Sequence, residues 1–134
     1  MKLMLDTNIC IAIIKQKPPA VLQQFAAYQI GDIGVSSVTL AELRYGVAKS
    51  QQREANQAAL DAFVLPLDVA DFDEAATQYY GALRASLEKQ GTPIGPLDTM
   101  IAAHALSLDV TLVTNNTKEF ARVDGLKLLD WFHA

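Results

Sequence analysis

The sequence predicts an α/β fold with three layers, in which a central parallel sheet of about five strands lies between helices. Two observations predict it. Short apolar runs alternate with helical patterns along the chain, as in βαβ units with right-handed crossovers. The first run, Leu3-Met4-Leu5, is apolar at every position, as expected of a strand covered on both faces of its sheet. The length of 134 residues is near the usual size of one domain, so we expect a single domain over residues 1–134.

The other elements follow in order from periodicity and from helix-breaking residues. Further strands are expected at 33–36, 64–67, 110–113 and 126–129. Pro66 predicts that the 64–67 strand lies at a sheet edge, because proline cannot donate to a ladder. Helices are expected at 9–15, 19–29, 37–49, 51–63, 70–90 and 97–108. The helix over 97–108 is so apolar that it must be buried nearly all round.

The composition argues against a protein that holds nucleic acid by bulk electrostatic attraction, because the net charge is −4 and the pI is near 5. Acidic residues gathered around metal ions would still permit a nucleic-acid substrate, since bound cations reverse the local field. No apolar run reaches the ~20 residues of a membrane span, and no secretory leader opens the chain. We therefore expect a cytoplasmic protein without membrane contact. Its single cysteine, Cys10, is expected in the core.

Acidic and amide side chains follow three of the expected strands, where the crevice of an open α/β sheet lies. Asp6 follows the first strand, Glu42 lies shortly after the second, and Asp98 opens the buried helix. The fourth strand is followed by a run of polar residues, namely Thr114, Asn115, Asn116, Thr117, Lys118 and Glu119. These positions are the candidates for a functional site.

Each candidate also has a structural interpretation. Asp6 is a good helix N-cap, Asp98 complements the positive end of a helix, and the segment after the fourth strand could be an Asn-rich turn. For Glu42 the two interpretations exclude each other, because Thr39-x-x-Glu42 is a capping box that would fold Glu42 back onto its own helix. A helix that starts at Ser37 would instead leave Glu42 free on the second turn.

The joint pattern favours a metal site. Three or four carboxylates in one pocket repel each other and raise their own pKa values, so a stable cluster needs a cation. Oxygen ligands without His or Cys select Mg²⁺ or Mn²⁺. Such an ion orients a water and lowers its pKa, which is the chemistry of phosphodiester hydrolysis. The fold must bring these residues together for this to hold.

The histidines and tyrosines are assigned other roles. His104 lies about 240° round the helix from Asp98, at ~100° per residue, and is expected to be in the core or partly exposed. His133 is expected in the tail. Tyr45, Tyr79 and Tyr80 lie at helical spacing and are expected to pack in the core or in a dimer rather than to stack on bases.

Four segments resemble a known family: Leu5–Asn8, Thr39–Gly46, Gly95–Ala103 and Leu112–Asn116. Together they resemble the PIN-domain nucleases, and most closely the VapC toxins of bacterial toxin–antitoxin pairs. The resemblance implies a three-layer α/β/α fold, a Mg²⁺-dependent endoribonuclease that could also use Mn²⁺, a homodimer, and neutralisation by a VapB-type antitoxin. The stretch from Thr114 to Leu126 resembles the branch that cleaves initiator tRNA in the anticodon loop, which implies tRNA as the RNA substrate.

The resemblance also implies roles for individual residues. Asp6, Glu42 and Asp98 match the family's acidic triad, while Asn116 stands where many members have a fourth acid, with Glu119 one turn later. Asp6 and Asp98 are expected to ligate the metal, and Glu42 to orient or deprotonate the attacking water. Asn116 and Glu119 would complete the surroundings of the ion. Expected substrate contacts come from two groups: Thr7, Asn8 and Thr114 to the phosphate or to metal-bound waters, and Arg44, Lys118 and Arg122 to the RNA backbone.

Three alternatives remain open. The chain could be another PIN-type RNA-processing nuclease. It could be an aspartyl phosphatase, although that class needs a second acid two residues after the first, where this chain has Asn8. It could also be a non-catalytic protein-binding domain whose acids are helix caps, which would bind no Mg²⁺.

Overall fold

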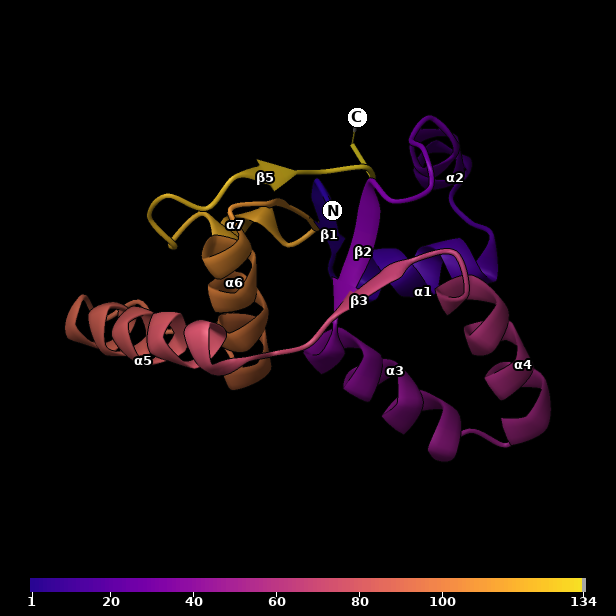
Figure 1. The fold of residues 1–134 in the computed structure, drawn as a ribbon, viewed down its shortest axis with the longest axis horizontal. Coiled ribbons are helices and arrows are strands. Elements are labelled where there is room, and N and C mark those ends of the chain that lie inside the picture. The colour runs from indigo at the N-terminus through magenta and orange to yellow at the C-terminus, as the bar shows by residue number, and fades with distance from the viewer. Residues whose placement is uncertain (134) are drawn as a thin grey trace.

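The computed structural model describes residues 1–133, whose five strands form one all-parallel sheet in the order β3-β2-β1-β4-β5. The strands are β1 (Leu3–Leu5), β2 (Ile33–Ser36), β3 (Asp68–Ala70), β4 (Thr111–Val113) and β5 (Leu128–Leu129). The helices are α1 (Thr7–Lys15), α2 (Pro19–Ala26), α3 (Ser37–Ala48), α4 (Arg53–Val64), α5 (Glu74–Lys89), α6 (Pro96–Leu108) and α7 (Thr117–Phe120). In Figure 1, α3 and α4 project from one side of the sheet, and α5 and α6 lie on the other side.

The alternation of side chains along β1 divides the core into two clusters, one on each face of the sheet. Leu3 and Leu5 belong to one cluster, together with buried residues of α1, α2 and α4. Met4 belongs to the other cluster, together with buried residues of α5, α6 and α7. Because successive side chains of a strand point to opposite faces, the sheet lies between two helical layers. The predicted three-layer α/β/α fold is confirmed.

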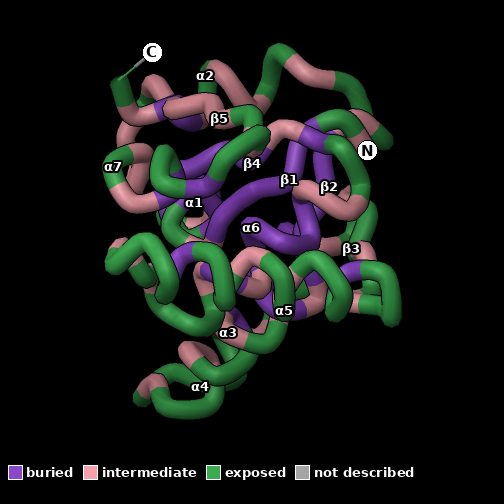
Figure 2. The backbone as a smooth tube through the Cα atoms, turned by 90° about the vertical axis from the view of Figure 1, so that its left-hand side faces the viewer, coloured by how far each residue is buried: buried purple, intermediate pink, exposed green. Residues whose placement is uncertain are grey.

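Helix α6 is the most buried helix, as its composition predicts. Ile101, Ala102, Ala103 and Ala105 have no exposed surface, and His104 is only 1% exposed. In Figure 2 the buried part of the chain comprises α6 and the central strands, while α4 and α5 are largely exposed. Cys10 is fully buried, as expected. No helix within residues 1–133 is long and apolar enough to cross a membrane.

The predicted strand at 64–67 is wrong. Val64 is the last residue of α4, residues 65–67 form the turn that follows, and the strand begins at Asp68. Val64 and Leu67 pack against the same core cluster as Leu60 and Phe63 of α4, whereas Leu65 is 87% exposed, so this apolar run ends a helix rather than entering the sheet. The third strand pairs only with β2 and so does lie at a sheet edge, but Pro66, from which this position was predicted, lies before the strand.

Further predictions differ from the structure, among them the helix expected over 19–29, which ends at Ala26, and the strand expected over 126–129, which begins at Leu128. The helix predicted from residue 70 starts at Glu74, because the Asp73 carboxylate accepts a hydrogen bond from the Ala76 N–H (3.0 Å) and caps α5. Tyr45 and Tyr79 are 67% and 46% exposed, so packing in the core of this chain is wrong for both. Packing in a dimer stays a prediction for them.

Candidate active site

Asp6 is a buried carboxylate at the carboxyl end of β1, and it both caps α1 and faces a distant segment. Its side chain is 4% exposed. The Thr7 N–H donates to Oδ1 (2.7 Å), and the Thr114 hydroxyl donates to Oδ2 (2.8 Å) from the end of β4. Burial raises the pKa of Asp6 from its ordinary value, the two hydrogen bonds lower this pKa, and the charge of Glu42 raises it. The capping interpretation is therefore correct, but it leaves each carboxylate oxygen a further lone pair for a ligand.

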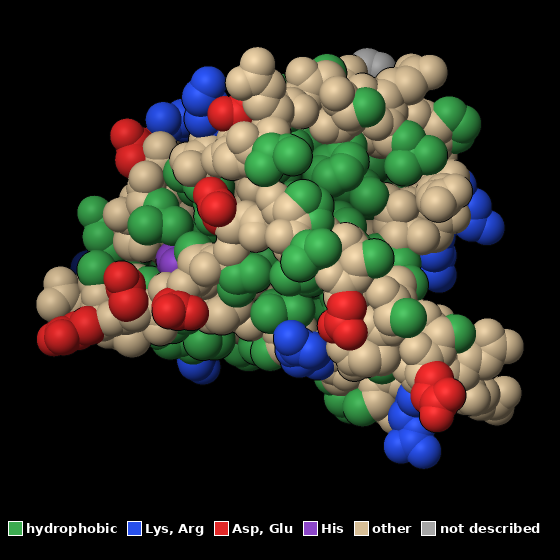
Figure 3. Space-filling model, turned by 45° about the vertical axis from the view of Figure 1, so that its right-hand side comes forward, with side chains coloured by type: hydrophobic (Ala, Val, Ile, Leu, Met, Phe, Trp, Pro, Cys, Tyr) green, Lys and Arg blue, Asp and Glu red, His purple; other side chains and the backbone are tan. Residues whose placement is uncertain are grey.

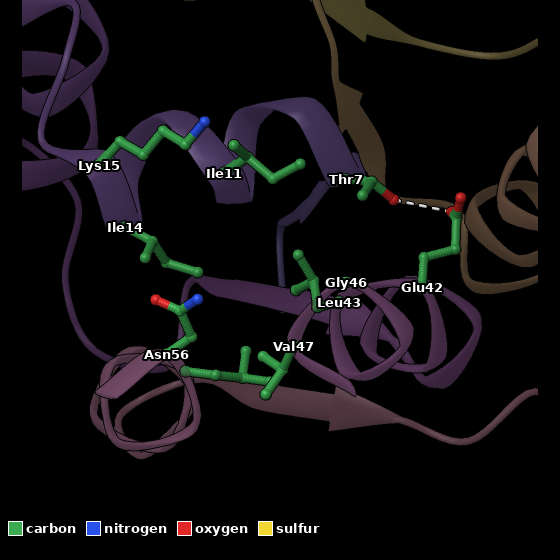
Figure 4. Close-up of a pocket in the computed structure, with 10 residues that line it drawn as sticks. Thr7, Ile11, Ile14, Lys15, Glu42, Leu43, Gly46, Val47 and Asn56 are labelled. Carbon is green, nitrogen blue, oxygen red and sulfur yellow. Dashed lines mark hydrogen bonds between the residues drawn. The ribbon is translucent and has the colours of Figure 1, made fainter. Parts of the chain in front are cut away.

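Glu42 is free of its own helix, so the capping-box interpretation is wrong. Helix α3 starts at Ser37, and its N-cap is Ser36, whose Oγ accepts a hydrogen bond from the Val38 N–H (3.1 Å). Glu42 therefore lies on the second turn, where its Oε1 accepts a hydrogen bond from the Thr7 hydroxyl (2.8 Å; Figure 4). Thr7 thus connects two candidate carboxylates, because its backbone N–H contacts Asp6 and its side chain contacts Glu42.

Asp98 lies in the first turn of α6, after the Gly95-Pro96 corner. Burial and, in decreasing order, the negative charges of Asp6, Glu42 and Glu119 together raise the pKa of Asp98 to about 6. Charges act on each other strongly only over short distances in a protein. Four carboxylates that are far apart in the sequence therefore share one region of the structure, as the sequence pattern requires.

The segment after β4 closes the site through a chain of hydrogen bonds. The Asn116 N–H donates to Thr114 Oγ1 (3.0 Å), whose hydroxyl donates to Asp6. The Asn116 side-chain amide donates to Glu119 Oε2 (2.8 Å). Asn116 is thus a neighbour of Glu119 and fixes its orientation. The side-chain oxygen of Asn115 is buried without a hydrogen-bond partner.

Only some of the residues predicted to contact the substrate lie beside the acidic residues. Asn8 and Lys118 are exposed next to site residues. Arg44 follows Glu42 by two positions, or about 200° round a helix, and lines a hollow with residues of α4 such as Arg53 and Asp61. Arg122 donates to the backbone carbonyl of Pro93 (3.0 Å) beside α5. The structure therefore does not bring Arg44 and Arg122 to the carboxylates.

Two lysines line cavities that Glu42 also lines, and they were not predicted from the sequence. Thr7, Glu42 and Lys15 line one cavity of about 320 Å³ between α1, α3 and α4 (Figure 4). Thr7, Glu42 and Lys49 line another, of about 760 Å³, together with Tyr45. Helical spacing could have found them: Thr7 and Lys15 are eight positions apart, and Glu42 and Lys49 seven, so each pair shares a helix face. On the surface drawn in Figure 3, by contrast, basic side chains are spread between acidic ones.

The donor set fits a hard divalent cation. The clustered ionisable groups are all carboxylates, and the nearest buried histidine, His104, is bonded to Ser36 instead (2.7 Å). In the described part of the chain, no three His, Cys, Asp or Glu side chains are placed to hold one ion together. Mg²⁺ needs fewer, since it usually takes one or two carboxylates and keeps several waters. Asp6 and Asp98 would suffice as the protein ligands.

Comparison with known proteins places the chain in a family. The family model described as PIN domain matches residues 3–126. The chain is 53% identical over 131 residues to the tRNA(fMet)-specific endonuclease VapC of Shigella flexneri, with 98% of each sequence covered. The chain belongs to the VapC family of PIN-domain proteins.

Solved structures of VapC proteins have the same fold as this chain. The structure of VapBC2 from Rickettsia felis bound to a DNA fragment from their promoter superposes with a TM-score of 0.92, at 45% identity and with 98% of this chain and 99% of that chain covered. The DNA-bound VapBC of Salmonella typhimurium also gives 0.92, at 44% identity and 98% coverage of both chains. The VapC resemblance drawn from the motifs is confirmed.

Proposed function

We propose that this protein is the toxin of a VapB–VapC toxin–antitoxin pair and hydrolyses RNA phosphodiester bonds with a divalent metal ion. The observation that carries the proposal is the convergence of four carboxylates, because the charges of Asp6, Glu42 and Glu119 all raise the pKa of Asp98. Helix capping alone does not require these carboxylates to lie close together, where they repel one another. The VapC relative from Shigella flexneri, whose name states an endonuclease activity, supports the same function.

The proposed cofactor is Mg²⁺, held by Asp6 and Asp98, with Mn²⁺ as a substitute. The all-carboxylate donor set supports this choice over zinc, which prefers His and Cys. When bound, such an ion neutralises charge on the phosphate and lowers the pKa of a water.

The protein's own residues would position the reacting groups. Glu42 would orient the attacking water and accept its proton. Thr7 would hold Glu42 in place through the hydrogen bond at 2.8 Å, and Thr114 would hold Asp6. Asn116 would keep the Glu119 carboxylate directed at the site. Asn8, exposed beside Thr7, would contact the scissile phosphate.

The proposed substrate is tRNA, specifically the anticodon loop of initiator tRNA. The resemblance of the 114–126 segment and the name of the Shigella flexneri relative both support it. Because the net charge is negative, specificity should depend on loop shape and splayed bases. Lys15 and Lys49, on the same helix faces as Thr7 and Glu42, would contact the RNA backbone, as would the exposed Lys118. Another RNA target of a PIN-type processing nuclease is the alternative.

We further propose a VapB-type antitoxin, a homodimer, one domain over residues 1–134 and a cytoplasmic location. The cavity of Figure 4 supports an antitoxin site, because Ile11, Ile14, Leu43 and Val47 give it an apolar lining beside Glu42. Partially exposed apolar residues near α6, such as Leu97 at 47%, support a second copy on that side.

The deciding experiment is incubation of the purified protein with total cellular RNA, with Mg²⁺ or with EDTA, followed by mapping of new RNA ends. The proposal predicts cleavage of one tRNA in its anticodon loop with Mg²⁺ only, and none by the Asp98→Asn variant. Release of inorganic phosphate from a small phosphoester with the RNA intact would indicate a phosphatase instead. Intact RNA together with no Mg²⁺-dependent change in thermal stability would indicate a non-catalytic domain.

A further inference from the structure

A buried polar pair outside the acidic site connects two of the helices that build it. Ser36 has no exposed surface and His104 is 1% exposed. The Ser36 Oγ and the His104 Nδ1 are 2.7 Å apart, although 68 positions separate them in the sequence. Ser36 ends β2 and caps α3, while His104 lies in α6. None of the roles assigned above uses this pair.

The Ser36 hydroxyl is hydrogen-bonded on both sides, which gives the pair a defined geometry. Burial lowers the pKa of His104, which favours the neutral imidazole at pH 7. When Nε2 carries the ring proton, Nδ1 accepts a hydrogen bond from the Ser36 hydroxyl. The Ser36 Oγ in turn accepts from the Val38 N–H (3.1 Å).

The loop before α5 closes over the pair. The Phe72 N–H donates to the Ser37 Oγ (3.0 Å), and the Phe72 ring meets the imidazole of His104 edge-on, with 5.4 Å between ring centres. The first turn of α3 is therefore held from two sides, by α6 through Ser36 and by this loop through Ser37. Water is excluded from the hydrogen bond between Ser36 and His104, because both residues are buried.

The two helices that this pair joins carry Glu42 and Asp98. Elsewhere their contact is apolar, since Val38 of α3 lies in the same cluster as Ile101 and Ala102 of α6. Apolar packing is non-directional, whereas a buried hydrogen bond fixes the position of both partners. We infer that the Ser36–His104 hydrogen bond sets the placement of α3 against α6, and that His104 is thereby a positioning residue for Glu42 relative to Asp98.

A small change at this bond would displace Glu42, because Ser36 lies at the start of the helix that carries it. Glu42 lies six positions beyond Ser36, or about 9 Å along the helix. A tilt of α3 by about 10° at its cap would therefore move Glu42 by about 1.6 Å. Misplacement of a catalytic group by ~1 Å can lower a rate ~10²-fold. Loss of the bond should thus reduce catalysis more than it reduces folding.

The test compares His104→Leu, which removes the bond, with His104→Asn, which can keep it. The asparagine amide oxygen, like the histidine Nδ1, is bonded to Cγ and can accept the hydrogen bond from Ser36. Ser36→Gly removes the hydroxyl from the other side, and glycine is a tolerated N-cap. His133→Leu, at the exposed histidine bonded to Asp130, is the matched control. For each folded variant we would measure kcat and KM for RNA cleavage, the thermal midpoint, and the affinity for Mn²⁺ by calorimetry.

The inference predicts that His104→Leu and Ser36→Gly lower kcat at least tenfold and weaken Mn²⁺ binding at least threefold, with KM little changed. His104→Asn should recover both values to within threefold of the wild type, and His133→Leu should change neither. A lower thermal midpoint with kcat and Mn²⁺ affinity within threefold of the wild type would overturn it, as would a His104→Asn variant as impaired as His104→Leu. If His104→Leu does not fold, Ser36→Gly and His104→Asn decide.

The kinetic part rests on the proposed RNA cleavage, whereas the calorimetric part rests only on the proposed metal site. A wild type that cleaves no RNA would contradict the nuclease proposal alone. Mn²⁺ affinities of the same variants would still show whether His104 positions the acidic residues.

Discussion

The substitution Asp98→Asn should stabilise the metal-free protein at neutral and alkaline pH. The pKa of Asp98 is raised to about 6 in the folded protein, from 3.8 as its ordinary value. The native state therefore binds this proton more tightly than the unfolded state does. Between about pH 4 and pH 6 the wild type loses stability as the pH rises, because the carboxylate ionises and its charge is disfavoured by burial and by three neighbouring negative charges. Asparagine has a similar shape and no charge, so it removes this cost.

The structure sets the size of the effect. A pKa displacement of about two units corresponds to at most about 3 kcal/mol. Asp98 is only half-buried, and solvent screening should reduce this to about 1–2 kcal/mol. For a chain of this length, 1 kcal/mol changes the midpoint by roughly 3–5 °C, which gives an expected rise of about 3–10 °C.

The assay is thermal unfolding by circular dichroism in EDTA at pH 8 and pH 4.5, for the wild type, Asp98→Asn and a control, Asp124→Asn, at an exposed acid after α7. The variant should unfold at a higher temperature than the wild type at pH 8, and the difference should shrink to about a third at pH 4.5, which is still above the ordinary pKa of 3.8. On addition of Mg²⁺ only the wild type and the control should gain stability. An Asp98→Asn protein that is equally or less stable at pH 8 without metal would refute the reasoning that like charges and burial raise this pKa.

Three further predictions follow from the site. Metal affinity should fall about tenfold per pH unit below pH 6, because the Asp98 carboxyl must lose its proton to bind a cation. Calorimetry with Mn²⁺ between pH 5 and pH 7.5 measures this affinity. An affinity that does not change with pH would exclude Asp98 as a ligand. Thr7→Val should lower kcat at least tenfold with the fold intact, because the capping N–H remains and only the hydroxyl is lost. Thr7→Ser, which keeps the hydroxyl, is the control. Equal kcat values for the two variants would contradict the role of the Thr7 hydroxyl in positioning Glu42. Lys15→Ala and Lys49→Ala should each raise KM for RNA, and each should reduce the slope of log affinity against log salt concentration by about one. Arg44→Ala should change neither value. The reverse result would place the RNA on the other face of α3.

Most of the fold could be predicted because periodicity and helix-breaking residues are local signals. The buried helix α6 is evident from its composition, and the strands before Asp6 and after Gly31 are evident from short apolar runs. The strand predicted at 64–67 fails because this apolar run spans the end of α4 and the turn that follows it. A short run of this kind does not distinguish a helix end from a strand.

The candidate site could be predicted as a set of residues but not as a geometry. Whether Glu42 caps its helix or faces the crevice depends on which residue starts α3, and Ser36 competes successfully with Thr39 for that position. The Thr7 hydroxyl, which holds Glu42, is a contact between elements and leaves no local pattern in the sequence. Arg44 is different, since counting 100° per residue from Glu42 already places it on another face.

The most direct measurement of the central claim is the anomalous diffraction of crystals soaked in Mn²⁺. The account predicts a peak in coordination distance of both Asp6 and Asp98, with Glu42 close enough to contact a water on the ion, and no such peak in Asp98→Asn crystals. A Mn²⁺ ion bound elsewhere, or a peak that persists unchanged in the variant, would contradict the claim that these separated acids form one metal site.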